Sequence, residues 1–133
     1  MTGHAATIAL LLRLTSDSGA WLGWEDLGCS SLLALQHVNT RNGSVVPQLA
    51  SLSAGFAMQP LLLDTFSTRQ GGMRAYLTAR EAGAHVILGP ARSAVSESVA
   101  TLGSIHEMPT LSYWASAATL SDERRYPLSL IHI

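Results

Sequence analysis

Two serines hold positions at which a hydroxyl group could bind a small ligand. Ser93 follows "LGPAR" and begins a segment with helical spacing of apolar residues, and Ser116 follows "TLSYW", which has the composition of a strand. At the start of a helix, unpaired N–H groups and the positive end of the helix dipole attract a carboxylate. The same position also suits a serine that only caps the helix. The residues alone leave both interpretations open.

Other kinds of chemistry find little support in the sequence. The five histidines have no metal-ligand spacing, and no HExxH, GxSxG or GxxxxGKS sequence is present. Formal net charge is -1, with eight scattered basic residues, which disfavours binding to nucleic acid. We therefore expect no metal, no cofactor and no enzymatic activity. An enzyme that binds a nucleotide or flavin on a flavodoxin-like sheet is a distant alternative.

Strands and helices alternate along the chain. Continuous apolar runs predict strands, and apolar residues at intervals of three and four predict helices. The expected strands are residues 7–14, 60–66, 85–89 and 110–114, and the expected helices are residues 26–41, 69–84 and a segment beginning at Ser93. This order predicts an α/β fold with an open parallel sheet and helices on both faces.

The parallel sheet predicts where a ligand would bind. In open sheets of this kind, ligands bind outside the carboxyl ends of the strands, where the strand order reverses. The loops expected there are "TSDSGAWLGWEDLG", "GPARSAVSE" and "WASAATLSD". Ser93 and Ser116 lie in two of these three loops, which favours a shared site.

Composition and short motifs bear on the protein's partners and on its location in the cell. The chain has 133 residues, of which 47% are hydrophobic and 13% charged, against about 25% charged in a typical domain. Such a composition suggests surface left for a missing partner or missing chain. Arg13 interrupts the apolar run "IALLL", so we interpret that run as a buried strand and expect neither a signal peptide nor a membrane span in this sequence. Asn42 begins an Asn-Gly-Ser tripeptide, a candidate glycosylation site.

The segment "GPARSAVSESVATLGSIHEMPTLSYWASAATLSDERRYP" resembles the extracellular ligand-binding region of metabotropic GABA and glutamate receptors, natriuretic-peptide receptors and bacterial amino-acid-binding proteins. "ALQHVN" and "SGAW" upstream are similar to the first helix and first loop of that family. The resemblance implies that residues 1–127 are part of lobe 1 of a two-lobed domain of the type I periplasmic-binding-protein class. It implies a receptor on the extracellular face of a membrane, closest to the G-protein-coupled GABA type, with a possible dimer partner. The alternative is a soluble substrate-binding protein of an amino-acid ABC transporter.

The resemblance also assigns roles to individual residues. Ser93 and Ser116 match the hydroxyl residues that hold the acidic end of an amino acid or similar carboxylate. Trp21 matches a tryptophan that covers the aliphatic part of the ligand. Trp114 stands where the receptors keep a serine or glycine, so it would reshape the pocket. Cys29 matches a cysteine that is disulfide-bonded in animal GABA receptors. However, Ser67 lies near the position where the second cysteine of that disulfide would be expected. The simpler interpretation is that Cys29 is a small buried residue.

The last six residues have a sequence that suggests a different origin from the rest of the chain. "LSLIHI", residues 128–133, resembles the translation of an adapter end used in sequencing libraries. The alternative is an ordinary apolar strand. We expect residues 128–133 to be an adapter-derived or otherwise non-native tail, and the remainder of a receptor to continue after Pro127.

Overall fold

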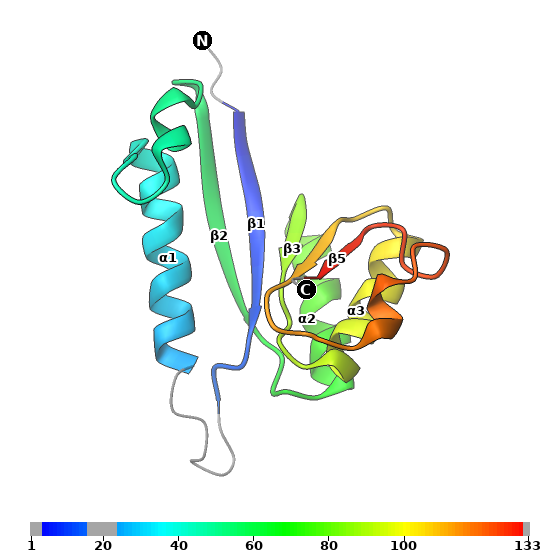
Figure 1. Cartoon of the computed structure of the whole chain (residues 1–133). Coiled ribbons are helices and arrows are strands. Elements are labelled where there is room, and N and C mark those ends of the chain that lie inside the picture. Colours follow the sequence, from blue (N-terminus) through cyan, green and yellow to red (C-terminus); the bar gives the residue numbers. More distant parts are fainter. Residues whose placement is uncertain (1–3, 16–23, 132–133) are drawn as a thin grey trace.

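A computed structural model describes residues 4–15 and 24–131 and shows an all-parallel five-stranded sheet (Figure 1). The strand order is β2-β1-β3-β4-β5, and every neighbouring pair is parallel. The α/β fold with an open parallel sheet is therefore confirmed. The elements are β1 (His4–Leu12), α1 (Trp24–Thr40), η1 (Pro47–Ser51), β2 (Phe56–Asp64), α2 (Arg69–Glu81), β3 (Val86–Leu88), α3 (Ser93–Ile105), β4 (Thr110–Ser112), η2 (Ala118–Ser121) and β5 (Ser129–Ile131).

Helices cover both faces of the sheet because β1 is apolar at successive positions. Side chains alternate between the two faces of a strand. Ala9 and Leu11 join a buried cluster with residues of α2 and α3, whereas Leu10 and Leu12 pack with Leu35 of α1. Figure 1 shows α1 alongside β1 and β2, with α2 and α3 on the other side of the sheet.

The second strand begins earlier than the sequence predicts. We expected residues 44–59 to be a long connection and the strand to start at Pro60, but β2 starts at Phe56 and pairs with β1 along its whole length. Proline lacks a backbone N–H and is tolerated on an edge strand, where that group is not needed for pairing. β2 is such an edge strand in the described sheet. Treating Pro60 as the strand's first residue was therefore wrong.

Residues 129–131 form a strand of the sheet. β5 pairs with β4, and the backbone N–H of Thr110 donates to the carbonyl of Leu128 at 2.9 Å. Ile131 packs against a buried cluster that contains Leu120 and Tyr126. A paired strand is compatible with either origin of these residues, so their origin as a non-native tail stays a prediction.

The exposure of Cys29 differs from what the sequence predicted. Cys29 is an exposed free cysteine on α1, so the interpretation of a buried small residue was wrong. Leu35 is an α1 residue buried against the sheet, and Cys29, six positions earlier, lies on another side of the helix. No helix in the described part of the chain is long and apolar enough to cross a membrane.

Candidate ligand-binding site

A cavity of about 420 Å³ opens at the carboxyl end of the sheet. The end of β1, the segments directly after β2 and β4, the loop between β3 and α3, and the first turns of α1 and α3 contribute to its wall. This is the end at which the parallel topology predicted a ligand site, next to the reversal of strand order between β1 and β3. The lining residues are Leu12, Arg13, Leu27, Thr65, Ser67, Pro90, Ala91, Arg92, Val95 and Tyr113.

Two buried serine hydroxyls hold the turn after β3. Ser96 of α3 and Ser112 of β4 both donate to the carbonyl of Pro90, at 2.8 and 2.7 Å. Ser112 also accepts from the backbone N–H of Ala115 at 3.1 Å. Buried hydroxyls normally need such partners. These bonds fix the loops after β3 and β4 relative to each other.

Gly89 brings this turn close to β1. Its φ is +103°, and a Cβ there would lie 2.3 Å from the carbonyl oxygen of Leu11. A side chain at this position would therefore collide with the backbone of the neighbouring strand. Glycine allows the chain to turn at this point and to place Pro90 and Ala91 against the cavity.

Ser93 and Ser116, the two serines expected to bind a ligand, lie together. The Ser93 hydroxyl oxygen accepts hydrogen bonds from the backbone N–H groups of Ser116 and Ala117, each at 3.2 Å. Ser93 is the first residue of α3, and among the described residues no side chain caps that helix. The serine thus joins the start of a helix to the loop after β4.

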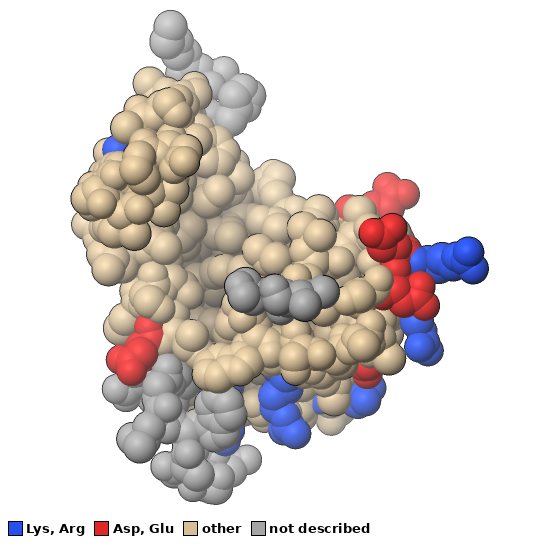
Figure 2. Space-filling model, in the orientation of Figure 1, with Lys and Arg blue, Asp and Glu red and all other residues tan. Residues whose placement is uncertain are grey.

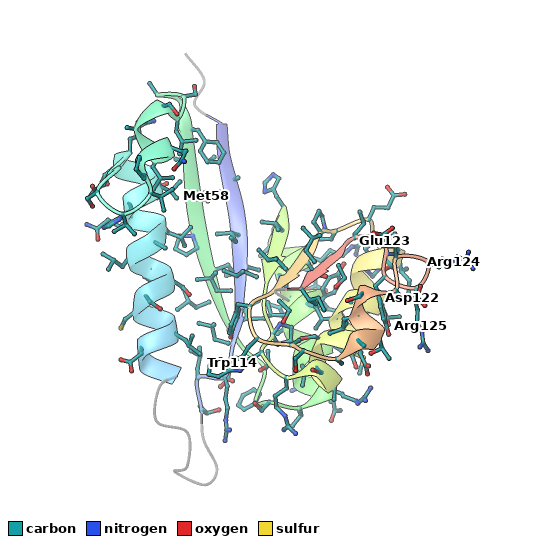
Figure 3. The ribbon with its side chains drawn as sticks, in the orientation of Figure 1. Met58, Trp114, Asp122, Glu123, Arg124 and Arg125 are labelled. Carbon is teal, nitrogen blue, oxygen red and sulfur yellow. The ribbon has the colours of Figure 1, made fainter. Side chains whose placement is uncertain are left out.

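The cavity wall and the predicted site residues are neighbours but do not coincide. Ser93, Ser116 and Trp114 are not among the described lining residues, although Arg92 and Tyr113 beside them are. Trp114 is 58% exposed, and Figure 3 shows it towards the carboxyl end of the sheet. Burial raises the pKa of the Tyr113 phenol, which keeps it neutral. Trp21 lies outside the described residues.

The loop after β2 also reaches the site, although the sequence did not lead us to expect it there. Asp64 accepts hydrogen bonds from the backbone N–H of Leu14 at 3.1 Å, the Thr15 hydroxyl at 2.6 Å and the backbone N–H of Phe66 at 2.8 Å. Partial burial alone would raise the pKa of Asp64, but these hydrogen bonds outweigh it and hold the pKa below its ordinary value. The hydroxyl-rich sequence "DTFST" was the available signal.

The two charged side chains among the described lining residues, Arg13 and Arg92, are basic. Arg13 donates to the carbonyl of Thr15 at 3.4 Å, and Arg92 donates to the carbonyl of Ser67 at 3.1 Å. Figure 2 shows Arg side chains, together with a smaller acidic patch, along the end of the molecule that carries these loops. The described lining includes no Asp or Glu. This charge pattern would favour an anionic ligand.

The charged turn after η2 lies away from the cavity. Figure 3 shows Asp122 and Arg124 in a turn away from Trp114, and Asp122 accepts from the backbone N–H of Arg124 at 3.0 Å. Among the residues that the structure describes, no group of three or more His, Cys, Asp or Glu could hold a metal ion. The described site is therefore built of hydroxyls, backbone N–H groups, guanidinium groups and apolar side chains.

The fold and its carboxyl-end cavity define a ligand-binding lobe of the periplasmic-binding-protein-like class. Residues 28–132 match the model of the receptor family ligand binding region, and the chain belongs to that family. A search of curated proteins finds no match.

Among solved structures, the chain is similar to the branched-chain amino acid transporter substrate-binding protein LivJ from Streptococcus pneumoniae, in complex with isoleucine. The TM-score is 0.69 at 13% identity, with 96% of this chain and 33% of that chain covered. At this identity the likeness shows the fold alone. The chain spans one third of the length of that protein.

Proposed function

We propose that this chain is the part of an extracellular two-lobed receptor domain that binds the acidic end of an amino acid or similar small carboxylate. The observation that carries the proposal is the convergence of two backbone N–H groups, from Ser116 and Ala117, on the hydroxyl of Ser93. A hydroxyl both donates and accepts. Ser93 can therefore keep these two bonds while donating its proton to a ligand carboxylate at the start of α3.

In this proposal the second lobe completes the site. Trp21 covers the aliphatic part of the ligand, Trp114 reshapes the pocket, and closure of the second lobe adds the contacts that hold the amine. Association costs at least about 4 kcal/mol in lost freedom, so one lobe alone gives weak affinity. We expect millimolar rather than micromolar binding of GABA or glutamate by residues 1–133.

The test is an NMR titration of the isotope-labelled chain with GABA, glutamate and isoleucine. At least one of these acids should shift the amide signals of Ser93, Ser116 and Ala117, and Ser93→Ala should weaken that response. Ser98→Ala is the matched control, because the Ser98 hydroxyl bonds only locally, to the carbonyl of Ala94 at 3.3 Å. Absence of shifts at these amides, or an equal response in Ser93→Ala, would remove them from the site.

The second candidate is a substrate-binding protein of an amino-acid transporter, which the likeness to LivJ favours. Both candidates use the same carboxylate site, and they differ in the polypeptide expected after the second lobe. A source transcript that encodes membrane helices there would support the receptor, most similar to the G-protein-coupled GABA type. A stop codon directly after the second lobe would support the transporter protein.

An extracellular location would make Asn42 available for glycosylation. Asn42 is exposed in the turn after α1, and its side chain accepts from the backbone N–H of Ser44 at 3.0 Å. Secretion from animal cells should add a glycan mass that Asn42→Gln abolishes. An unmodified secreted product would contradict the assignment.

A further inference from the structure

Two arginines line the cavity but have no role in the carboxylate site proposed above. Arg13 directly follows β1, and Arg92 directly precedes α3. Within the described part of the chain neither guanidinium forms an ion pair with a carboxylate, because the ion pair found there joins Arg69 and Glu97. The described residues therefore leave the positive charge at the cavity uncompensated.

The loop after β2 holds the Arg92 side chain at the cavity. Arg92 donates to the carbonyl of Ser67 at 3.1 Å. Phe66 and Ser67 have φ values of +49° and +52°, in the left-handed region that residues other than glycine rarely adopt. Their backbone N–H groups donate to Asp64 at 2.8 Å and to the Thr65 hydroxyl at 3.3 Å, which holds this conformation. Such conformations cluster at functional sites.

The bond to Ser67 leaves most of the Arg92 guanidinium for a ligand. A guanidinium carries five N–H donors, and its planar fork matches the two oxygens of a carboxylate. One of its terminal nitrogens donates to Ser67. Asp26, next to the lining residue Leu27, is exposed and lies outside the described lining, so its carboxylate is solvated. Arg92 is thus fixed in place and still able to bind a carboxylate.

The rest of the cavity wall suits a short aliphatic chain. Leu12 and Val95 line it and are almost fully buried, and the ring of Tyr113 adds aromatic surface. In pockets of this kind a few charged or polar groups orient the ligand, and the apolar wall contacts its hydrocarbon part. A ligand with methylene groups and an acidic end fits both features.

Arg92 and Ser93 are consecutive residues whose polar groups contact different loops. The Ser93 hydroxyl accepts from two backbone N–H groups of the loop after β4. The Arg92 guanidinium instead donates to the loop after β2. Neighbouring Cα atoms are about 3.8 Å apart, so a small ligand can reach both groups at one turn of the chain. If one carboxylate binds at Ser93, Arg92 is placed to bind a second acidic group.

We propose that Arg92, with Arg13, makes this site selective for a small amino acid that carries a second carboxylate on its side chain. The inference rests on the proposed function, in which Ser93 binds the first carboxylate. Arg92 pairs with the second carboxylate, and Arg13 adds positive charge at the end of β1. An amino acid with a neutral side chain lacks this interaction.

The test compares glutamate with glutamine, which has nearly the same shape but a neutral side chain. In NMR titrations of isotope-labelled residues 1–133, both should shift the amide signals of Ser93, Ser116 and Ala117, and glutamate should also shift the guanidinium signal of Arg92. Glutamate should bind about three to ten times more tightly, because water partly screens a charge-assisted hydrogen bond at an exposed guanidinium. Added salt should reduce this ratio.

Variants separate recognition from a structural effect. Arg92→Gln should abolish the preference by weakening glutamate alone, whereas disruption of the loop would weaken both ligands. Arg92→Lys, which keeps the charge, should retain part of the preference. Arg74→Gln is the matched control, because Arg74 is exposed on α2, lies outside the described lining and contributes the same net charge. It should retain the full preference.

The outcomes distinguish failure of this inference from failure of the proposed function. Equal affinity for glutamate and glutamine, with shifts at Ser93, would overturn the inference and leave the carboxylate site standing. Equal weakening of both ligands in Arg92→Gln would also overturn it, as would the same loss of preference in Arg74→Gln. Absence of shifts at Ser93, Ser116 and Ala117 with either ligand would overturn the proposed function and this inference with it.

Discussion

The side-chain amide of Asn39 on α1 pairs with both backbone polar groups of Met58 on β2. Asn39 donates to the Met58 carbonyl at 2.8 Å and accepts from the Met58 N–H at 2.7 Å. In this way the helix closes part of the outer edge of β2, which no other described strand pairs. An open strand edge is a template for unwanted pairing with another chain. Asn39 therefore protects the sheet and fastens α1 to it.

Replacing Asn39 tests the role of this pair of hydrogen bonds. Asn39→Ala should lower the free energy of unfolding by about 1–2 kcal/mol, because two backbone groups lose partners. Asn39→Asp should cost less than Asn39→Ala, since a carboxylate still accepts from the Met58 N–H. Thr40→Ala, the neighbouring control, should stay within about 0.5 kcal/mol. Urea unfolding measures all three, and an equal cost for Asn39→Ala and Thr40→Ala would contradict the assigned role.

Ser112 should be needed for the turn that borders the cavity. Ser112→Ala removes the bond to the Pro90 carbonyl and leaves the buried N–H of Ala115 without its acceptor. The expected cost is about 1–3 kcal/mol of unfolding free energy. Ser98→Ala should cost about 0.5 kcal/mol or less, as its bond is local. Near-neutral behaviour of Ser112→Ala would show that the hydroxyl cluster does not hold the loops.

The layered core was predictable because β1 is apolar on both faces. Residues 7–14 could be assigned to a covered strand without knowing their partners, and helices on both faces followed from the order of elements. β2 was misplaced because Pro60 looks like a boundary in the sequence, and only the pairing partner reveals that β2 is an edge strand. The predicted burial of Cys29 failed because one residue does not define which side of a helix meets the sheet.

The site was predictable in position but not in detail. The rule for parallel sheets selected the carboxyl end, and the cavity lies there. The sequence could not show that Asp64 binds the loop after β1, because that contact joins residues about fifty positions apart. Nor could it separate Ser112, which is buried, from Ser116, which is exposed. Those distinctions depend on tertiary packing.

The origin of residues 128–133 can be checked directly. If they derive from an adapter, amplification from source cDNA across the Pro127 codon should yield a different sequence in place of "LSLIHI". The true continuation should then supply its own strand beside β4. Recovery of "LSLIHI" followed by a native stop codon would show the tail to be genuine.

Gly89 and Gly83 form a matched pair that separates backbone conformation from crowding. Both have positive φ, +103° and +76°, but a Cβ at Gly83 meets nothing within 4 Å, whereas one at Gly89 meets the Leu11 carbonyl. Gly83→Ala should cost about 1–2 kcal/mol for conformation alone. Gly89→Ala should cost clearly more, about 3 kcal/mol or above. Thermal and urea unfolding measure the loss of stability in each variant. Equal losses would contradict the close approach of Gly89 to the Leu11 carbonyl.

Asp64 should make stability depend on pH in the acid range. Its folded pKa lies below the ordinary value of 3.8, so the folded state favours the charged carboxylate. Such a group contributes stability that is fully present above the unfolded pKa and is lost as the pH falls through the folded pKa. Asp64→Asn lacks this contribution. The stability gap between wild type and Asp64→Asn should therefore be largest near neutrality and shrink as pH falls below about 4.

Thr15 supplies an internal control for this effect. Thr15→Val removes the 2.6 Å hydrogen bond to Asp64 but keeps the carboxylate and its backbone N–H donors, which include Leu14 and Phe66. The pKa of Asp64 should rise towards its ordinary value, and the loss of stability with acid should begin at higher pH. Urea unfolding at several pH values between about 6 and 3 measures each curve. A gap between wild type and Asp64→Asn that stays constant over this range would show that Asp64 does not carry the acid dependence.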